Sequence, residues 1–444
     1  EKHKIKTMVV IGPISSFKAW VDEYKACFWW KRKPRILNTL LCKNRKDKIY
    51  CLRNNSYDLI LVNYEWLESI KEVLAEIIDT KTMLVFDEVH KIKRVDWVRA
   101  SAALSICWWA KYKVVLTWTP IPNSYADLYN QLNILYTDEY NTFFNMTPVV
   151  LAQKNESIQE EINKKIYPFF CRTTKRELQV PEPNKDEKII AYMDEKEKKL
   201  FSMIHRKFAN NTLLLYIRLL QASNNPKLLL NEIDKNMLLN LYEAEDENEW
   251  EMDLEEELND VNNEDYFEQS EKEFIESFNM TTKFWEWIEK VRELVSQNKT
   301  VVVWWIFVNT LDTISKELNK IWISNKIIYW SVPPEEREQI IEWFKNKEFM
   351  VLITNPHTMA ESVSLHKECH DAVYFEYSFN LTHMLQSRDR INRLWLPEWQ
   401  YTQYYYLFLV NDESWEDSID LKTYDRLKEK EDVMVKAIEW EHII

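Results

Sequence analysis

The stretch MLVFDEVHKIKR, residues 83–94, places an acidic pair directly after a short apolar run. A run of this kind is typical of a strand buried in a parallel sheet. Asp87 and Glu88 would then lie at the carboxyl edge of that sheet, where α/β proteins place their ligands. In a nucleoside triphosphatase, one such acid holds Mg²⁺ and the other orients and deprotonates the attacking water. A solvent-facing acidic turn explains these residues alone equally well.

The same alternation of a short apolar run and an amphipathic helix recurs on both sides of this stretch. It predicts an α/β fold with parallel sheets covered by helices on both faces. Strands are expected within residues 7–13, 57–64, 82–88 and 112–118, and again within 300–308, 325–331, 349–355, 371–377 and 403–410. Between the two groups, the apolar spacing of residues 148–239 is mostly helical.

This order divides the chain into three parts, which we expect at residues 1–182, 183–282 and 283–444. The first and last are α/β lobes, and the middle part is a helical connection. The connection contains residues 243–276, with seventeen Asp or Glu residues and one Lys. Their local charge of −16 exceeds the net charge of −14, so the rest of the chain carries +2. We expect a flexible, solvated insertion. A protein partner for this segment is the alternative.

Other features of the composition exclude several classes of protein. No apolar run approaches the ~20 residues of a membrane span, and the opening EKHKIK lacks the apolar core of a signal peptide. The six cysteines form no CxxC pair, so neither a disulfide framework nor a zinc site is supported. We therefore expect an intracellular, soluble protein without a membrane partner.

The chain has one glycine and twenty tryptophans. Average usage of about 7% predicts roughly thirty glycines in a chain of this length. Several tryptophans stand in expected loops, for instance Trp118 in the turn LTWTP. Turns favour Gly, Asn or Asp. We interpret the pattern as tryptophan standing where glycine is usual.

A second chemical signal is LQSRDRINRLW, residues 385–395, within an expected helix over 382–394. In a helix, Gln386, Arg390 and Arg393 share one face because they are four and three residues apart. Two arginines on a common face can clamp the oxygens of a transferring phosphate group. An exposed helix with solvated arginines is the alternative.

The order of these segments resembles the motif series of superfamily-two helicases, most closely the Swi/Snf-type (DEAD/DEAH-like) branch of DNA-dependent ATPases. The form of residues 361–395 is similar to helicases of bacteria, phages and large viruses. The resemblance implies two RecA-like lobes, the cofactors ATP and Mg²⁺, and double-stranded DNA as the partner. It also favours the cytoplasm, with its nucleoid, or a viral host cell over the nucleus. The segments that carry it are VVIGPISSFKAWVDEY, YDLILVNYEWL, FDEVHKIKR, VVLTWTPIPNSYADLYNQLNIL, FFCRTTKREL, VVVWWIFVNTLDTI, YWSVPPEEREQIIEWF and QSRDRINRLW.

The resemblance also assigns roles to residues of this chain. Asp87 would hold the Mg²⁺ of Mg·ATP, Glu88 would activate water, and His90 would couple the nucleotide state to lobe motion. Thr117 and Thr119 would link the ATP site to the nucleic-acid groove. Gln386, Arg390 and Arg393 would reach the γ-phosphate from the second lobe. Contacts to the phosphodiester backbone, which are independent of base sequence, would come from Gly12, Pro13, Ser15, Asn63, Tyr64, Asn309 and Thr354.

Some positions depart from the family pattern. Trp118, Trp330 and Trp395 stand where the family has glycine, and Asn392 replaces a frequent His. An indole in a tight loop would cost about 1–3 kcal/mol of backbone strain. No glycine-rich phosphate loop precedes the strand at 7–13, so we expect these 444 residues alone not to hydrolyse ATP.

The leading hypothesis is a DNA-dependent ATPase that translocates on double-stranded DNA. An RNA or single-strand helicase is a second reading. A catalytically silent scaffold that binds nucleic acid, with the acidic segment recruiting a partner, is a third.

Overall fold

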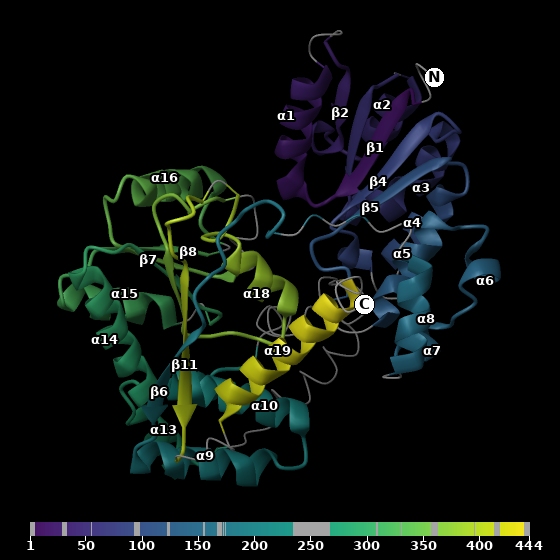
Figure 1. The fold of residues 1–444 in the computed structure, drawn as a ribbon. Coiled ribbons are helices and arrows are strands. Elements are labelled where there is room, and N and C mark those ends of the chain that lie inside the picture. Colours follow the sequence, from purple (N-terminus) through teal and green to yellow (C-terminus); the bar gives the residue numbers. More distant parts are fainter. Residues whose placement is uncertain are drawn as a thin grey trace. The chain divides into compact units, whose positions relative to one another are not determined.

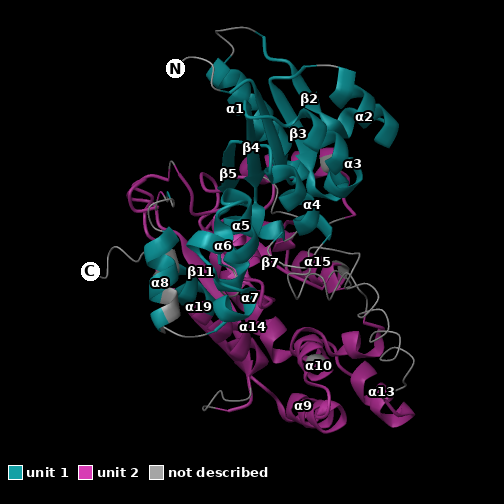
Figure 2. Ribbon diagram, turned by 90° about the vertical axis from the view of Figure 1, so that its right-hand side faces the viewer, with its two compact units in different colours: residues 1–172, 430–444 teal, residues 173–429 magenta. Residues whose placement is uncertain are grey.

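The computed structural model describes most of the chain. The described residues are 5–28, 33–54, 56–92, 98–121, 125–153, 156–166, 171, 173, 175–233, 267–307, 310–329, 331–356, 363–394, 396–412 and 418–438. They form two compact units, residues 1–172 with 430–444, and residues 173–429 (Figure 2). Each unit is described by itself.

The first unit is built on a five-stranded sheet in the order β2-β3-β1-β4-β5 (Figure 1). Every pairing between these strands is parallel. The strands are β1 (Thr7–Gly12), β2 (Ile36–Asn38), β3 (Leu59–Asn63), β4 (Thr82–Asp87) and β5 (Tyr112–Leu116). Four of the five lie where the apolar runs predict them. The three-residue strand β2 is too short to give such a signal.

Alternate residues of β1 enter two different cores. Val9 and Ile11 pack with α3 and α4, whereas Val10 packs with Phe17 at the start of α1. This alternation explains why the strands read as continuous apolar runs, because both faces of the sheet are covered. The helices are α1 (Phe17–Phe28), α2 (Arg45–Asn54), α3 (Tyr64–Ile77), α4 (Val98–Cys107), α5 (Leu128–Leu135), α6 (Tyr140–Phe143), α7 (Pro148–Leu151) and α8 (Glu156–Ile166).

The second unit contains a six-stranded sheet in the order β6-β11-β10-β7-β9-β8, again parallel in every pairing that the structure describes. The strands are β6 (Glu187–Tyr192), β7 (Val301–Trp304), β8 (Asn325–Ile328), β9 (Val351–Thr354), β10 (Asp371–Tyr374) and β11 (Gln403–Val410). The helices are α9 (Glu195–Phe208), α10 (Thr212–Asn224), α13 (Gln269–Glu276), α14 (Thr282–Ser296), α15 (Leu311–Lys320), α16 (Pro334–Lys345), α18 (Leu381–Arg388) and α19 (Ile419–Ile438). The predicted fold class, α/β with two parallel sheets, is confirmed.

Two parts of the second unit differ from the expectation of a helical, partly flexible connection. Residues 187–192 form β6, which pairs with β11 at the edge of the sheet. Its sequence EKIIAY begins with two charged residues and has four apolar or aromatic residues after them, so it lacks the longer apolar run of a buried strand. The end of the acidic segment forms α13, whose Ile275 is buried in the main core with Phe267 just before it. Residues 243–266 lie outside the described part.

Tryptophan and backbone conformation also differ from expectation. Trp118 is half-exposed and is not among the described residues with positive φ, so the strain expected at this turn is absent. Among the described tryptophans, the one with positive φ is Trp322, with φ 61° and 94% exposure. Trp330 and Trp395 lie outside the described residues.

Candidate functional site

The carboxyl edge of the first sheet brings together residues from four strands. Strand β1 ends at Gly12, β3 at Asn63, β4 at Asp87 and β5 at Leu116. Gly12 is in register with Asn63, and Asp87 is in register with Leu116. The carboxyl ends of adjacent parallel strands meet at one edge. Residues that the sequence places far apart therefore share one site.

Asp87 is held by two hydrogen bonds from neighbouring elements. The indole Nε1 of Trp20 in α1 donates to Asp87 Oδ2 at 2.8 Å. The hydroxyl of Tyr64 at the start of α3 donates to the backbone carbonyl of Asp87, also at 2.8 Å. A carboxylate that accepts a bond at one oxygen has a fixed orientation, as metal-binding carboxylates in proteins usually do. Sequence reasoning missed Trp20, although it lies within the quoted segment that contains Gly12.

Gly12, the one glycine of the chain, lies directly beside this carboxylate. A Cβ atom at Gly12 would be 3.0 Å from Asp87 Cβ and 3.2 Å from Ser16 Oγ. The φ of Gly12 is not positive, so an L-residue could adopt this backbone conformation. Close approach, rather than conformational freedom, is therefore what requires glycine here.

Glu88 and His90 connect the end of β4 to the turn after β5. Glu88 has φ 51°, a left-handed conformation that is unusual for a residue with a side chain. His90 is buried, with Nδ1 3.2 Å from Glu88 Oε2 and 3.1 Å from Thr117 Oγ1. Thr117 Oγ1 also accepts the backbone N–H of Thr119 at 3.1 Å. A left-handed residue next to Asp87 is the kind of local strain that clusters at functional sites.

The residues expected to contact nucleic acid divide into two groups. Pro13 and Ser15 are partly exposed beyond β1. Asn63 and Tyr64 are only 2% and 1% exposed, and their side chains bond within the unit to Glu65 and to the Asp87 carbonyl. Burial leaves these two without the surface that a backbone phosphate would need. Tyr64 instead supports Asp87.

The arginine segment of the second unit, defined as residues 388–393, is not the continuous helix that was expected. Helix α18 ends at Arg388. After it, the backbone N–H groups of Arg390 and Ile391 donate to carbonyls three residues back, at 3.2 and 3.3 Å. These 3₁₀ bonds turn the chain more tightly than an α-helix, and they are followed by a bond from the Asn392 N–H to the Arg388 carbonyl, four residues back, at 3.2 Å. The prediction that Gln386, Arg390 and Arg393 share one helical face is therefore wrong.

The three residues have different environments. Gln386 lies on α18 and is half-buried, and Arg393 is exposed. Arg390 is buried, and its Nη1 donates to the carbonyl of Val363 at 3.3 Å. Only Arg393 has its side chain open to solvent, so it is the arginine of this segment best placed to contact a ligand.

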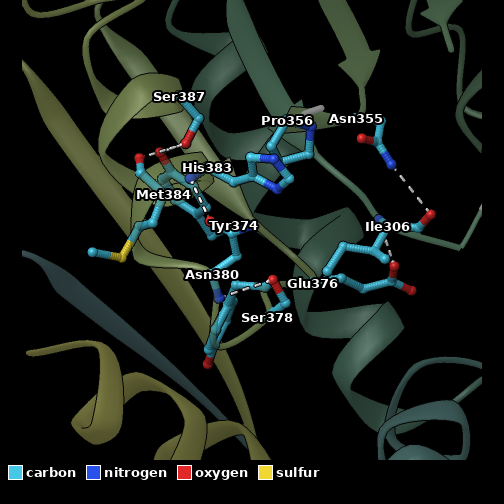
Figure 3. Close-up of a pocket in the computed structure, with 11 residues that line it drawn as sticks. Ile306, Asn355, Pro356, Tyr374, Glu376, Ser378, Asn380, His383, Met384 and Ser387 are labelled. Atoms are coloured by element: carbon cyan, nitrogen blue, oxygen red, sulfur yellow. Dashed lines mark hydrogen bonds between the residues drawn. The ribbon is translucent and has the colours of Figure 1, made fainter. Parts of the chain in front are cut away.

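A small pocket of about 20 Å³ lies at the carboxyl edge of the second sheet (Figure 3). It is lined by the ends of β7, β9 and β10 and by α18, through residues Ile306, Asn355, Pro356, Tyr374, Glu376, Tyr377, Ser378, Asn380, His383, Met384 and Ser387. The volume suffices for one water molecule. Thr354, expected at a nucleic-acid contact, precedes Asn355 and is fully buried. Asn309 lies outside the described residues.

Glu376 is the carboxylate among the residues that line this pocket. Its Oε2 accepts the backbone N–H groups of Ile306 and Phe307 at 2.7 and 2.8 Å. Burial raises the pKa of Glu376 to about 8, against the opposite effect of these two bonds. Its Oε1 is buried and has no hydrogen-bond partner in the part of the chain that the structure describes. Sequence reasoning missed Glu376, although a charge inside the apolar run DAVYFEY is itself a signal.

Within the described ranges, no cluster of three or more His, Cys, Asp or Glu residues could hold a metal ion by itself. Mg²⁺ usually takes one or two carboxylates and completes its shell with phosphate oxygens and water. The single carboxylate of Asp87 fits an ion that arrives with a nucleotide. Among the described residues, no helix is long and apolar enough to cross a membrane.

Comparison with known proteins agrees with this arrangement. The family model of the SNF2-related domain matches residues 1–238, and that of the helicase conserved C-terminal domain matches residues 286–394. The SNF2-related match corrects the broader description DEAD/DEAH-like, because DEAD-box proteins form a different branch.

Curated relatives are much longer than the matched region. "Nuclear protein STH1/NPS1" of Saccharomyces cerevisiae is 26% identical over 210 residues, which is 43% of this chain and 15% of that protein. "ATP-dependent helicase brm" of Drosophila melanogaster is 27% identical over 195 residues, 41% of this chain and 12% of that protein. Among solved structures, the "Sulfolobus solfataricus SWI2/SNF2 ATPase core in complex with dsDNA" is 18% identical, with a TM-score of 0.36 over 99% of this chain and 87% of that one.

Proposed function

The chain belongs to the SNF2-related domain family, and from that premise we propose that it is the motor part of a DNA-dependent ATPase that translocates on double-stranded DNA. The observation that carries the proposal is the linked set of Asp87, Glu88, His90 and Thr117 at the carboxyl edge of the first sheet. The helicase C-terminal match over residues 286–394 supports it, because those residues include the arginine segment. Relatives whose names describe an ATP-dependent helicase and a subunit of a chromatin-remodeling complex support it further.

The proposal gives each acid one task. Asp87, oriented through Oδ2 by Trp20, would hold Mg²⁺. When bound, the ion neutralises charge on the phosphate oxygens. Glu88 would orient and deprotonate the attacking water, and the nearby His90 imidazole would fix the Glu88 carboxylate. Because His90 also contacts Thr117, a change at the nucleotide would reach the turn after β5.

The second unit would supply positive charge to the γ-phosphate. We assign that contact to Arg393, with Arg390 holding the local backbone through Val363. Gln386 would contribute from α18. Contacts with the DNA backbone are assigned to Pro13 and Ser15, which are partly exposed beyond β1. Such contacts suit an enzyme that moves along any base sequence.

The test is DNA-stimulated phosphate release by the complete protein, comparing wild type with Glu88→Gln and with Glu72→Gln. Glu72 is an exposed acid of α3 and serves as the matched control. We expect Glu88→Gln to abolish turnover while nucleotide binding remains, because only the base is lost. Equal rates in wild type and Glu88→Gln would remove Glu88 from this role.

Movement along DNA is tested separately by displacement of a third strand from a DNA triplex. Displacement without separation of the duplex strands is the expected result. Unwinding of a tailed substrate in place of triplex displacement would identify an RNA or single-strand helicase. DNA binding that neither needs nor stimulates ATP hydrolysis would identify a scaffold.

A further inference from the structure

Residues 175–186, which we call the strap, run along the arginine segment and lead into β6 (Figure 1). Both lie in the second unit. In the sequence, the strap begins a few residues after the first unit ends. Three sets of contacts join the strap to the arginine segment, one near each end and one between.

The first set is formed by Lys175. Its Nζ donates to Asp389 Oδ1 at 2.5 Å, to Asn392 Oδ1 at 2.8 Å and to the Asn392 carbonyl at 3.0 Å. An ammonium group has three N–H donors and no acceptor. These bonds therefore use the whole capacity of Lys175, and they bracket Arg390 from both sides in the sequence.

Asp389 depends on this contact electrostatically. Burial raises the pKa of Asp389, and the Lys175 ammonium acts in the opposite direction. A charged, partly buried carboxylate is costly without a paired cation. Loss of Lys175 would leave Asp389 without that cation.

The second set is formed by Asn392, two residues after Arg390. Its Nδ2 donates to the carbonyl of Pro181 at 2.9 Å. Asn392 thus bonds to the strap through both ends of its amide, because its Oδ1 accepts from Lys175. A side chain fixed at donor and acceptor has little rotational freedom.

The third set is formed by Asp186 at the other end of the strap. Arg388 Nη2 and Nη1 lie 3.2 and 3.5 Å from the two oxygens of Asp186. The same carboxylate accepts the Tyr424 hydroxyl at 2.8 Å and lies 3.2 Å from Lys428 Nζ, both on α19. Asp186 is largely buried, where paired charges interact more strongly than at the surface.

We infer that the strap is a positioning element for the arginine segment, with Lys175 and Asp186 as its two anchor residues. This inference rests on the proposed ATPase function only for its catalytic consequence. No regular helix covers residues 389–392, and the strap holds them in place. In this way it sets the placement of Arg393, the next residue. Neither anchor is proposed to touch nucleotide or DNA.

The structural part is tested on the 444-residue chain by hydrogen exchange of the amides at 389–392. We expect Lys175→Met to speed exchange there by about tenfold, because charge-assisted hydrogen bonds are lost. The control is Lys198→Met, which breaks an ion pair of 2.8 Å with Glu195 on α9 in the same unit and should leave these amides unchanged. Unaltered protection of 389–392 in Lys175→Met would overturn the inference.

A second variant, Asp186→Asn, guards against a folding defect in the first. It weakens the Arg388 contact while keeping the shape of the side chain, so exchange should rise at Arg388 and Asp389 more than at Asn392. A uniform rise over the whole second unit in both variants would indicate general loosening, and would also overturn a local positioning role.

The catalytic part uses the complete protein and DNA-stimulated ATP hydrolysis. Lys175→Met should lower kcat and leave the KM for ATP within about twofold, because ground-state binding is untouched. Lys175→Arg, which keeps the charge, should recover part of the rate. A normal kcat in Lys175→Met despite faster exchange would refute positioning for catalysis. A wild-type protein without ATPase activity would refute the proposed function instead. The exchange measurement would still test whether the strap positions the arginine segment.

Discussion

The acidic edge of the first unit and the arginine segment of the second are held in place by different means. Asp87 ends a strand that is paired on both sides, so the sheet fixes its backbone. The arginine segment follows the end of a helix and is fixed by side chains of the strap, above all Lys175. A sheet edge tolerates changes in surrounding side chains, whereas a segment held by side chains depends on each of them. The two regions should therefore respond differently to substitution.

The largest expected effect comes from removing the charge that the arginine segment presents. Arg393→Ala should lower DNA-stimulated phosphate release by about 10³-fold or more if this side chain contacts the γ-phosphate. The folded structure should be preserved, since Arg393 is exposed. Arg292→Ala, an exposed arginine of α14, is the control. A loss of less than tenfold in Arg393→Ala would leave the segment without its assigned role.

The next effect concerns the loop after β7, which is also held by a side chain, Glu376. The pKa of the Glu376 carboxyl group rises from an ordinary 4.5 to about 8, so the folded state binds the proton of this group more tightly than the unfolded chain does. The contribution of this protonation to the free energy of unfolding is therefore complete below pH 4.5, and it is lost as the pH rises through 8. Glu376→Gln should flatten the pH dependence of the free energy of unfolding across this range. Chemical denaturation at several pH values measures it, and equal slopes in both proteins would contradict the assignment.

A smaller effect is expected at the acidic edge, from Gly12→Ala. The new Cβ would lie 3.0 Å from Asp87 Cβ, so the strand ends must separate slightly. We expect a loss of about 1–3 kcal/mol in the free energy of unfolding. Ala110→Ser, near the start of β5, adds one atom away from this contact and is the comparison. Full stability of Gly12→Ala would show that the sheet edge is more adaptable than the structure indicates.

The smallest effect tests how far the sheet alone fixes Asp87. Trp20→Phe removes the bond to Oδ2 and keeps an aromatic ring. If the backbone dominates, the apparent Mg²⁺ dependence of nucleotide binding should shift by about tenfold, the lower end of the effect of removing an outer-shell partner. Trp66→Phe on α3 is the matched control. If Trp20→Phe shifts the Mg²⁺ dependence as much as loss of the Asp87 carboxylate does, the acidic edge depends on side chains as strongly as the arginine segment.

The sequence predicts the acidic edge well because strands and their ends are local features. The run MLVFDE contains both the strand and the acids, and the parallel order of strands brings Gly12 and Asn63 to the same edge. The sequence does not show that Asn63 and Tyr64, for which a phosphate contact is predicted, are buried, because burial of a polar side chain depends on its neighbours in space.

The arginine segment shows the limit of periodicity. Gln386, Arg390 and Arg393 have the helical spacing of four and three in the sequence, but helix α18 ends at Arg388, before either arginine of this set. The contacts that hold the segment come from residues about two hundred positions away. The edge strand β6 was missed for a related reason, since it becomes a strand through pairing with β11. Local composition reveals neither the strap contacts of the arginine segment nor the pairing of β6 with β11.

Trp322 has a practical consequence for handling this protein. Its indole is almost wholly in water, and its backbone occupies a conformation that suits glycine. Because the ring packs against almost nothing, folding gains little from it, while exposed aromatic surface promotes aggregation. Replacement by glycine or asparagine at this one position offers a route to a better-behaved preparation that leaves both functional regions unchanged.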